Sequence, residues 1–315
     1  MTTIKLFKSL ADETRLRIFN VLIQYEFNVN ELVQVMGMGQ SRISRHLKIL
    51  AESGLLRHRR DGSYVYYQAI TNERTRKLAE FIQESGAVDP EFHADLQRAE
   101  QILEERKRRT QRFFASVAKH WDRIKEEVFG DFDLSSVIRA KTPSGQQVIV
   151  DLGCGTGELL LELLDTAQTV IGVDATPKML EQARKRMNSH GSSIDLRLGE
   201  LEHLPLKDQE ADSAVINMVL HHLPTPALGI REASRILKPG GRFIIADFAK
   251  HNLESVRDKY GGPWLGFTKE EIEEWLSDAG FHLESMDSYD VLQSLRVQVF
   301  VAVRNEHFSV DNQDS

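Results

Sequence analysis

The most constraining part of this chain is QQVIVDLGCGTGELLLELL, residues 146–164. Its apolar run Val148–Leu152 predicts a buried strand, the glycines predict a tight turn, and the leucine-rich segment after them predicts a helix. From about residue 146 onward, further short apolar runs alternate with helical patterns. This alternation is typical of an α/β domain, in which helices cross over between parallel strands.

Length and charge indicate that the α/β domain is not alone. A chain of 315 residues is long enough for about two domains. Residues 1–85 carry 13 Lys and Arg against nine Asp and Glu, whereas the remainder carries 27 against 38. A basic first quarter on an acidic chain indicates that only this part meets a polyanion. We expect a DNA-binding domain at 1–88, a helical linker with a covering helix at 89–129, the α/β domain at 130–305 and a flexible tail at 306–315.

Composition excludes several classes of protein. The sequence has no run of about 18 apolar residues, which a membrane-spanning helix needs. Asp12, Glu13 and Arg15 lie where a secretory signal would be apolar. The single cysteine, Cys154, excludes an internal disulfide and any zinc site built on cysteine pairs. We therefore expect a cytoplasmic protein with no membrane segment and no metal.

Apolar residues at helical spacing predict three short helices near the N-terminus. The first two cover Leu10–Ile23 and Asn30–Met36. The sequence G-M-G-Q at 37–40 then predicts a tight turn, since glycine adopts positive φ without a steric cost. A third helix follows this turn. Its inward face carries Ile43, Leu47 and Leu50, and its outward face carries Gln40, Ser41, Arg42, Ser44, Arg45 and Lys48.

These helices are typical of a helix-turn-helix, whose second helix enters the major groove of DNA, where Arg pairs with guanine. In the following segment, LLRHRRDGSYVYYQ, Asp61-Gly62 lies between strand-like arms and predicts a β-hairpin. Arg59 and Arg60 beside that turn are candidates for contacts with the DNA backbone or the minor groove. The alternative is a helix-turn-helix used only for protein contacts, with its arginines in solvent.

Over residues 4–84 the chain resembles the ArsR-type winged helix-turn-helix repressors. The resemblance rests on LFKSLADETRLRIFNVL, QSRISRHLKILAESGLL and RRDGSYVYYQ. It implies a homodimer that binds operator DNA with an inverted repeat, usually as a repressor. The family's metal sensors carry cysteines before the turn, or histidines and acidic residues on the helix after the hairpin. This chain lacks those cysteines and histidines, so we expect an inducer other than a soft metal.

Acidic residues end three successive predicted strands of the α/β domain. Asp151 ends the first strand, Asp174 ends TVIGVD and Glu200 ends IDLRLGE. Because open α/β sheets bind ligands at the carboxyl ends of their strands, we expect these side chains to share a site. The carboxylate of Asp174 is suited to accept hydrogen bonds from both ribose hydroxyls, and that of Glu200 from the amino group of adenine.

The spacing of the glycines in the predicted loop distinguishes between two kinds of nucleotide-binding site. Gly153, Gly155 and Gly157 are spaced G-x-G-x-G, which lets the backbone approach a flat ligand closely. A dinucleotide site requires G-x-G-x-x-G, and Leu160 stands where the third glycine would fall after Gly155 and Gly157. A loop that binds pyrophosphate is therefore the poorer interpretation.

Together, residues 111–303 resemble class I S-adenosylmethionine-dependent methyltransferases. The likeness is nearest to the type 11, small-molecule group that includes the ubiquinone and menaquinone biosynthesis enzymes, and RFFASVAKHWDRI resembles that group's cofactor-covering helix. The resemblance implies a Rossmann-like sheet of seven strands, with S-adenosylmethionine as cofactor and S-adenosylhomocysteine as product. The implied cofactor contacts are Trp121, Asp151, Gly153, Cys154, Gly155, Gly157, Asp174, Ala175, Met179, Glu200, Leu201 and Asn217.

Two histidines follow the fourth predicted strand of this domain. The methyl group of a sulfonium is already activated, so positioning the acceptor supplies most of the rate and a base is useful but not obligatory. His221 and His222 are candidates for such a base, with Asp247 at the end of the fifth strand behind them. The alternative is that the histidines only shape the pocket. Three aromatic residues would either line the acceptor site or belong to the core: Tyr260, Trp264 and Phe267.

The linker carries an apolar stripe followed by a basic run. We expect the stripe to pack on the DNA-binding domain or on a partner chain. The basic run, EERKRRTQR, is expected to be a solvated helix face or to touch phosphates. The stripe consists of Phe92, Leu96, Ala99 and Leu103.

Three functions are compatible with these patterns. The first is a DNA-binding regulator, with a repressor expected, whose methyltransferase domain methylates a small molecule. The second is a non-catalytic sensor of S-adenosylmethionine or S-adenosylhomocysteine that controls operator binding. The third is a small-molecule methyltransferase whose N-terminal domain only forms the dimer. The outward Arg and Ser side chains of the third helix favour the first two, and we expect the first.

Overall fold

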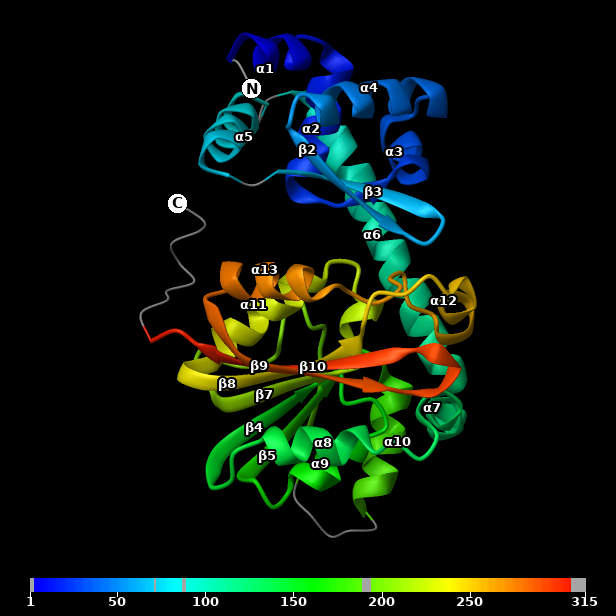
Figure 1. Ribbon diagram of the computed structural model, residues 1–315, viewed down its shortest axis with the longest axis vertical. Coiled ribbons are helices and arrows are strands. Elements are labelled where there is room, and N and C mark those ends of the chain that lie inside the picture. Colours follow the sequence, from blue (N-terminus) through cyan, green and yellow to red (C-terminus); the bar gives the residue numbers. More distant parts are fainter. Residues whose placement is uncertain (1–2, 71, 87–88, 189–193, 307–315) are drawn as a thin grey trace. The chain divides into compact units, whose positions relative to one another are not determined.

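The computed structural model of the chain (Figure 1) divides into two compact units, Met1–Lys107 and Arg108–Ser315. The boundary falls inside α6 (Pro90–Val117), so each unit contains part of the segment expected as a linker. The domain boundaries expected at residues 88 and 129 remain predictions. The structure describes residues 3–70, 72–86, 89–188 and 194–306, so that most of the expected tail lies outside it.

The first unit consists of helices packed around a small antiparallel sheet of order β1-β3-β2. The predicted hairpin is present, but its turn lies one residue later than the Asp61-Gly62 pair: Asp61 is paired with Tyr64, and Gly62 and Ser63 form the turn. The strand β1 was not predicted, because two residues are too few to show an alternating pattern. The elements are α1 (Thr3–Leu10), α2 (Glu13–Gln24), β1 (Phe27–Asn28), α3 (Val29–Met36), α4 (Gln40–Glu52), β2 (Leu56–Asp61), β3 (Tyr64–Ala69) and α5 (Glu73–Gly86).

Local sequence explains how the helix-turn-helix begins and ends its helices. Asn28 and Glu31 form a capping box at the start of α3, each bonding the backbone of the other. Gly37 ends α3 in the left-handed conformation, at φ 63°. The expected inward residues of α4 are all buried: Ile43, Leu47 and Leu50.

The second unit contains the expected sheet of seven strands, in the order β6-β5-β4-β7-β8-β10-β9. Strands β4 to β8 are parallel, and β10 is antiparallel to both of its neighbours. The strands are β4 (Gln146–Leu152), β5 (Ala167–Asp174), β6 (Ile194–Leu198), β7 (Ala211–Asn217), β8 (Leu237–Phe248), β9 (Phe281–Asp290) and β10 (Arg296–Arg304). The helices are α7 (Trp121–Phe129), α8 (Leu134–Lys141), α9 (Glu158–Leu163), α10 (Pro177–Asn188), α11 (Pro226–Ile236), α12 (Glu254–Tyr260) and α13 (Lys269–Asp278).

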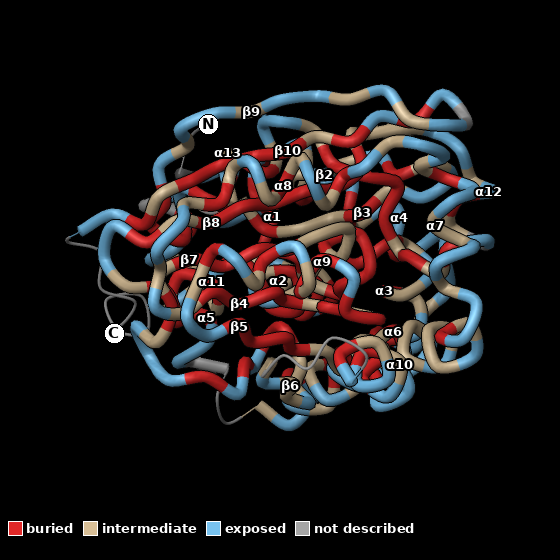
Figure 2. The backbone as a smooth tube through the Cα atoms, turned by 90° about the horizontal axis from the view of Figure 1, so that it is seen from below, coloured by how far each residue is buried: buried red, intermediate tan, exposed pale blue. Residues whose placement is uncertain are grey.

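Helices cover both faces of this sheet. Figure 1 shows α8, α9 and α10 on one face and α11 and α13 on the other. Most of β8 and β10 is buried between these layers, whereas the edge strand β9 is largely exposed (Figure 2). The carboxyl ends of β4, β5 and β7 therefore meet at one edge of a double-covered sheet, where the glycine loop follows β4. None of the described helices is long and apolar enough to cross a membrane.

Candidate ligand site and nucleic-acid interface

Asp151 lies at the base of the candidate ligand site, at the end of β4. The residue is 1% exposed, and its Oδ1 atom has no hydrogen-bond partner among the described residues. Burial, with a further contribution from the nearby carboxylate of Asp174, raises the pKa of Asp151 to about 7. A buried carboxylate without a partner is costly unless a ligand supplies a cation or a donor. Asp151 is therefore suited to receive an ammonium group.

Asp174, at the end of β5, holds the glycine loop in place. Its Oδ2 atom accepts a hydrogen bond from the backbone N–H of Gly155 at 3.0 Å, and its Oδ1 atom accepts one from Thr176 at 2.7 Å. Burial raises the pKa of Asp174 to about 6, and both backbone hydrogen bonds oppose that rise. The carboxylate is thus mostly ionised at neutral pH. Each oxygen retains a lone pair that a hydroxyl group can use.

The glycines of the loop have different surroundings. A Cβ atom on Gly153 would lie 2.5 Å from Cγ2 of Val219, so only glycine fits where the loop meets the segment after β7. A Cβ atom on Gly155 would meet only the indole Nε1 of Trp121, at 3.9 Å. Both glycines have left-handed φ values, 84° and 54°. The Trp121 indole therefore lies over the side of the loop on which Gly155 has no other close neighbour in the described chain. Trp121 and Gly155 are both among the predicted cofactor contacts.

An ion cluster that the sequence did not predict holds α7 against the loop. Asp122 accepts a hydrogen bond from the Thr156 hydroxyl at 3.1 Å and is ion-paired with Arg186 of α10. Lys125 contacts Asp122 at 3.5 Å and forms an ion pair with Glu158. Burial lowers the pKa of Lys125, and the nearby charges of Asp122 and Asp151 oppose that shift. A positive charge thus stands near the buried carboxylate of β4.

Cys154 turns its side chain away from the ligand side of the loop. Its thiol is buried and lies 2.9 Å from where a Cβ atom on Gly172 of β5 would stand. Burial raises the pKa of this thiol well above its ordinary value, so the thiol is a core group and not a nucleophile. The cofactor contact predicted at Cys154 thus remains a prediction for its backbone.

The remaining predicted cofactor contacts surround the same strand ends. Leu201 and Met179 are buried, and Ala175, Glu200 and Asn217 are half-buried. The Oδ1 atom of Asn217 has no hydrogen-bond partner in the described part of the chain. Gly157 precedes α9 at φ 80°. Their roles in binding remain predictions.

The two predicted catalytic histidines follow β7, and Asp247 holds one of them. The His221 ring nitrogen Nδ1 lies 2.7 Å from Oδ1 of Asp247, and the His221 backbone N–H donates to Oδ2 at 3.2 Å. All three of His221, His222 and Asp247 are buried. The His222 ring lies 3.9 Å from that of His221, and burial lowers the pKa of His222 well below its ordinary value. An imidazole oriented by a carboxylate is a suitable general base.

The aromatic residues beside the histidines are not those considered from the sequence. Tyr260, Trp264 and Phe267 are all buried, and the Trp264 indole donates to the carbonyl of Leu223 at 2.7 Å. These three belong to the core. Two other rings meet the histidines: Phe114 of α6 is edge-on to His222 with the ring centroids 4.7 Å apart, and Phe248 at the end of β8 lies 5.1 Å from the ring of His221. The arrival of Phe114 from a distant helix could not be predicted from local patterns.

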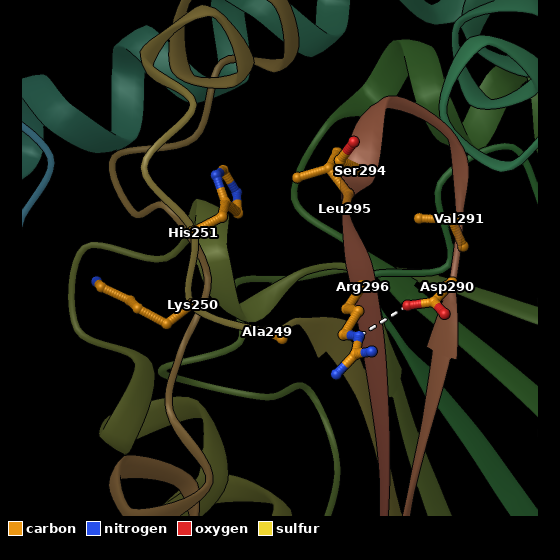
Figure 3. A pocket seen from close by; sticks show the side chains of 8 residues that line it. All are labelled: Ala249, Lys250, His251, Asp290, Val291, Ser294, Leu295 and Arg296. Carbon is orange, nitrogen blue, oxygen red and sulfur yellow. Dashed lines mark hydrogen bonds and ion pairs between the residues drawn. The ribbon is translucent and has the colours of Figure 1, made fainter.

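A separate hollow of about 340 Å³ lies where β8 ends beside the β9–β10 hairpin (Figure 3). Arg296 and Asp290 are paired across the hairpin at 2.7 Å, and the Lys250 side chain points away from the hairpin. None of the predicted site residues lines this hollow. Its lining consists of Ala249, Lys250, His251, Asp290, Val291, Ser294, Leu295 and Arg296. Among the described residues, no group of three or more His, Cys, Asp or Glu side chains is arranged to hold a metal ion.

The outward face of α4 is exposed along its whole length. Arg42 reaches back to donate to the Thr14 hydroxyl at 3.1 Å, and Arg45 donates to the carbonyl of Ser41 in its own helix at 3.3 Å. All six residues predicted to face outward are exposed: Gln40, Ser41, Arg42, Ser44, Arg45 and Lys48. Their contacts with DNA remain a prediction.

The hairpin arginines differ from each other. Arg60 is exposed, whereas the side chain of Arg59 is 19% exposed. The Arg59 guanidinium donates to both carboxylate oxygens of Glu26, at 2.6 and 3.2 Å. Of the two predicted DNA contacts on the hairpin, Arg60 is thus the accessible one, while Arg59 would have to leave Glu26.

Comparison with known families matches each of the two units separately. Residues 12–58 match the family described as bacterial regulatory protein, arsR family. Residues 150–245 match the family described as methyltransferase domain. The first match contains the helix-turn-helix, and the second contains the glycine loop, the acidic strand ends and the histidine pair.

Individual relatives match the second unit in part. The demethylmenaquinone methyltransferase of Desulfitobacterium hafniense is 31% identical over 166 residues, which are 50% of this chain and 64% of that protein. The ubiquinone/menaquinone biosynthesis C-methyltransferase UbiE of Rubrivivax gelatinosus is 32% identical over 148 residues, 46% of this chain and 58% of that protein. The chain thus spans less than two thirds of the length of these relatives.

A solved structure shares the fold of the second unit. It is a chain from the complex between the Trm112 methyltransferase activator of Haloferax volcanii and a methyltransferase. The two chains are 22% identical, with a TM-score of 0.52, and the match covers 61% of this chain and 97% of the other. At this level of identity the likeness concerns the fold alone.

Proposed function

Because the chain carries an ArsR-family helix-turn-helix and a methyltransferase domain, we propose that it is a DNA-binding transcriptional regulator, acting as a repressor, that also methylates a small molecule. The observation that carries the methyltransferase half is the buried Asp151 carboxylate, whose Oδ1 atom has no hydrogen-bond partner among the described residues, beneath a glycine loop that Asp174 holds and Trp121 covers. The exposed polar face of α4 supports the DNA-binding half.

The residues of the site fit S-adenosylmethionine. Asp151 would accept the ammonium group of the methionine moiety, since its Oδ1 atom needs a cationic or donor partner. Asp174 would accept the ribose hydroxyls, and Glu200 and Leu201 would meet the adenine. The cofactor, when bound, supplies an activated methyl group on a cationic sulfur. The remaining predicted contacts are Trp121, Gly153, Cys154, Gly155, Gly157, Ala175, Met179 and Asn217.

The histidine pair would act on the methyl acceptor. His221, which Asp247 orients, would take the proton that the acceptor loses when its nucleophilic atom gains the methyl group. His222 is neutral at physiological pH because burial lowers its pKa, so it would shape the acceptor site and not add charge. Phe114 packs edge-on against His222. The buried aromatic surroundings of the pair, with Phe248 beside His221 and Phe114 beside His222, favour a small organic acceptor.

The first unit supports a homodimer. Ile4 and Phe7 of α1 are 69% and 60% exposed, and Phe81 of α5 is 63% exposed. Ile4 and Phe7 are three residues apart and so share one face of α1, and adjoining exposed apolar side chains mark interaction surfaces more often than isolated ones do. We propose that a second copy of the chain covers them, which would also place two reading helices on an inverted repeat.

One experiment tests both halves of this proposal. The full chain is titrated with a labelled duplex from the promoter region of its own gene, without ligand, with S-adenosylmethionine and with S-adenosylhomocysteine, while methyl release is followed. We expect sequence-specific binding of the duplex and calorimetric heat from both nucleosides. Absence of heat at millimolar concentration would disprove the cofactor site, and binding no tighter than to random DNA would disprove the regulator.

The second candidate function is a sensor that binds the same nucleosides and does not transfer a methyl group. It uses the same pocket residues, and it is favoured by the fact that one helix, α6, belongs to both units. The sensor predicts saturable nucleoside binding and a change in DNA affinity without methyl release for any acceptor offered.

A further inference from the structure

The helix α6 contributes side chains to two different sites. It is one uninterrupted helix of 28 residues, and its residues 90–107 belong to the first unit while residues 108–117 belong to the second. In the first unit its partners lie on α2 and α3, the helices that contact α4. In the second unit its partners lie beside the proposed nucleoside site.

In the first unit, α6 is bonded to both ends of α3, the first helix of the helix-turn-helix. Arg106 is buried, and its Nε donates to Oε1 of Glu31 at 2.8 Å. Glu31 also completes the capping box that starts α3, and the Arg106 guanidinium lies 5.3 Å from the ring centroid of Phe27. At the other end of α3, Arg98 donates to the carbonyl of Val35. Part of the basic run expected in solvent is thus a structural element.

A second buried ion pair joins α6 to α2. Arg17 donates to the two carboxylate oxygens of Asp95 at 2.7 and 2.9 Å, and Asp95 is fully buried. Both α2 and α3 contact the reading helix α4. Because breaking a buried ion pair is strongly unfavourable, α6 cannot shift without moving the helices that support α4 or weakening these pairs.

In the second unit, the end of α6 forms a wall of the ligand site. A Cβ atom on Gly261 would lie 2.5 Å from the Phe113 ring, so the two are in close contact. The Phe114 ring is edge-on to Trp121, with the centroids 5.2 Å apart, and to His222. Trp121 in turn covers the loop at Gly155. A nucleoside on that loop would therefore meet Trp121, and through it Phe114.

We propose that α6 couples the nucleoside site to DNA binding. Occupation of the site changes the packing of Trp121 on Phe114, and α6 passes this change to α3 through Arg98 and Arg106. The ligands are S-adenosylmethionine, with a cationic sulfur, and S-adenosylhomocysteine, with a neutral one. The inference rests on the proposed function, because it requires both ligands to bind. Coupling is reciprocal, so DNA must change nucleoside affinity by the factor by which the nucleoside changes DNA affinity.

The test uses the full chain, S-adenosylhomocysteine and a duplex that the protein itself enriches from a random-sequence pool. DNA affinity is measured with and without saturating nucleoside, and nucleoside affinity with and without saturating DNA. We expect both affinities to change by the same factor, roughly fivefold or more. Equal DNA affinities in the two states would overturn the coupling.

A matched pair of variants tests the role of α6 itself. The change Arg108→Gly with Arg109→Gly weakens the helix at the unit boundary, since glycine disfavours helix strongly. The change Arg108→Ala with Arg109→Ala removes the same charges and preserves the helix. We expect the glycine variant to lose the coupling to within twofold and the alanine variant to retain it. Equal coupling in both variants would show that the helix is not the path.

Hydrogen exchange on the unaltered protein provides a test that needs no variant. Addition of S-adenosylhomocysteine should change amide exchange in residues 90–107 and in α3, besides the nucleoside site. A change confined to residues 108–306 would contradict the proposal. If the protein binds no nucleoside or enriches no duplex, the proposed function itself fails. If it binds both and they do not affect each other, only the coupling fails.

Discussion

Two buried aspartates, one in each unit, differ in whether other side chains bond to their carboxylates. Asp95 and Asp151 are almost equally inaccessible, at 0% and 1% exposed. Asp95 is fully engaged, because Arg17 donates to both of its carboxylate oxygens. Asp151 has one oxygen, Oδ1, without a hydrogen-bond partner in the described part of the chain, and its pKa is raised to about 7. Equal burial therefore does not imply equal engagement, since Arg17 holds one carboxylate while the other retains an oxygen that a ligand could use.

The largest effect is expected from Asp95→Ala. It removes the buried partner of the Arg17 guanidinium and leaves only the more exposed carboxylates of Glu91 and Glu13, which should lower the free energy of unfolding of the first unit by up to about 3–5 kcal/mol. Urea unfolding followed by helical circular dichroism measures this loss. The tryptophans, all in the second unit at positions 121, 264 and 275, give a separate fluorescence transition that should not move. An unchanged helical transition would mean that the pair contributes nothing.

The next effect concerns the histidine pair of the second unit. Replacing both His221 and His222 with Ala should lower the rate of methyl transfer about 100-fold or more, because the base is lost. The measurement is methyl release with any accepted substrate, and nucleoside affinity is measured by calorimetry alongside. The variant His282→Ala, which changes an exposed histidine on β9, serves as the control. Unaltered turnover in the double variant would eliminate the histidines as bases.

The substitution Asp151→Asn tests the second of the two buried aspartates, the one at the proposed ligand site. It keeps the shape of the side chain and removes the charge, so nucleoside affinity should fall about 10- to 100-fold, as expected for loss of a hydrogen bond to a charged group. The unfolding transition of the tryptophans should not move to lower urea, in contrast to the effect of Asp95→Ala on the first unit. A variant that binds the nucleosides normally would show that Asp151 is not their ammonium site.

The pH dependence of binding sharpens the same contrast. With a pKa of about 7 in the free protein, Asp151 is mostly protonated at pH 5.5 and mostly ionised at pH 7.5. Only the ionised form attracts an ammonium group, so nucleoside affinity should rise roughly tenfold over that range and binding should release protons. Asp174, with a pKa of about 6, contributes in the same direction. A pH-independent affinity in the unaltered protein would contradict this prediction.

The smallest effect is expected on the exposed face of α4. Lys48→Ala removes one exposed cation, and it should weaken DNA binding several-fold and reduce the slope of log affinity against log salt by about 1. The change Lys178→Ala, at an exposed lysine of α10, is the matched control. An identical salt slope in the Lys48 and Lys178 variants would remove Lys48 from the interface.

Much of the fold and of each site was predictable because it depends on local patterns. Helical spacing identified the inward residues of α4, and the glycine loop with its acidic strand ends identified the carboxyl edge of the sheet. The central strands β4 and β5 were recognisable as apolar runs before helices, and the full sheet of seven strands was expected from the resemblance to methyltransferases. The two-residue strand β1 was missed, because its formation depends on pairing with β3.

The amino-acid sequence by itself determined where helices and strands form and which residues face outward on α4, since backbone preferences and side-chain periodicity act over a few neighbours. Only the tertiary structure decided which buried polar groups find partners. Arg59 reaches Glu26, Arg106 reaches Glu31, and Phe114 meets His222. These contacts join residues 33, 75 and 108 positions apart. Their energies depend on distance and desolvation in three dimensions, which no spacing along the chain records.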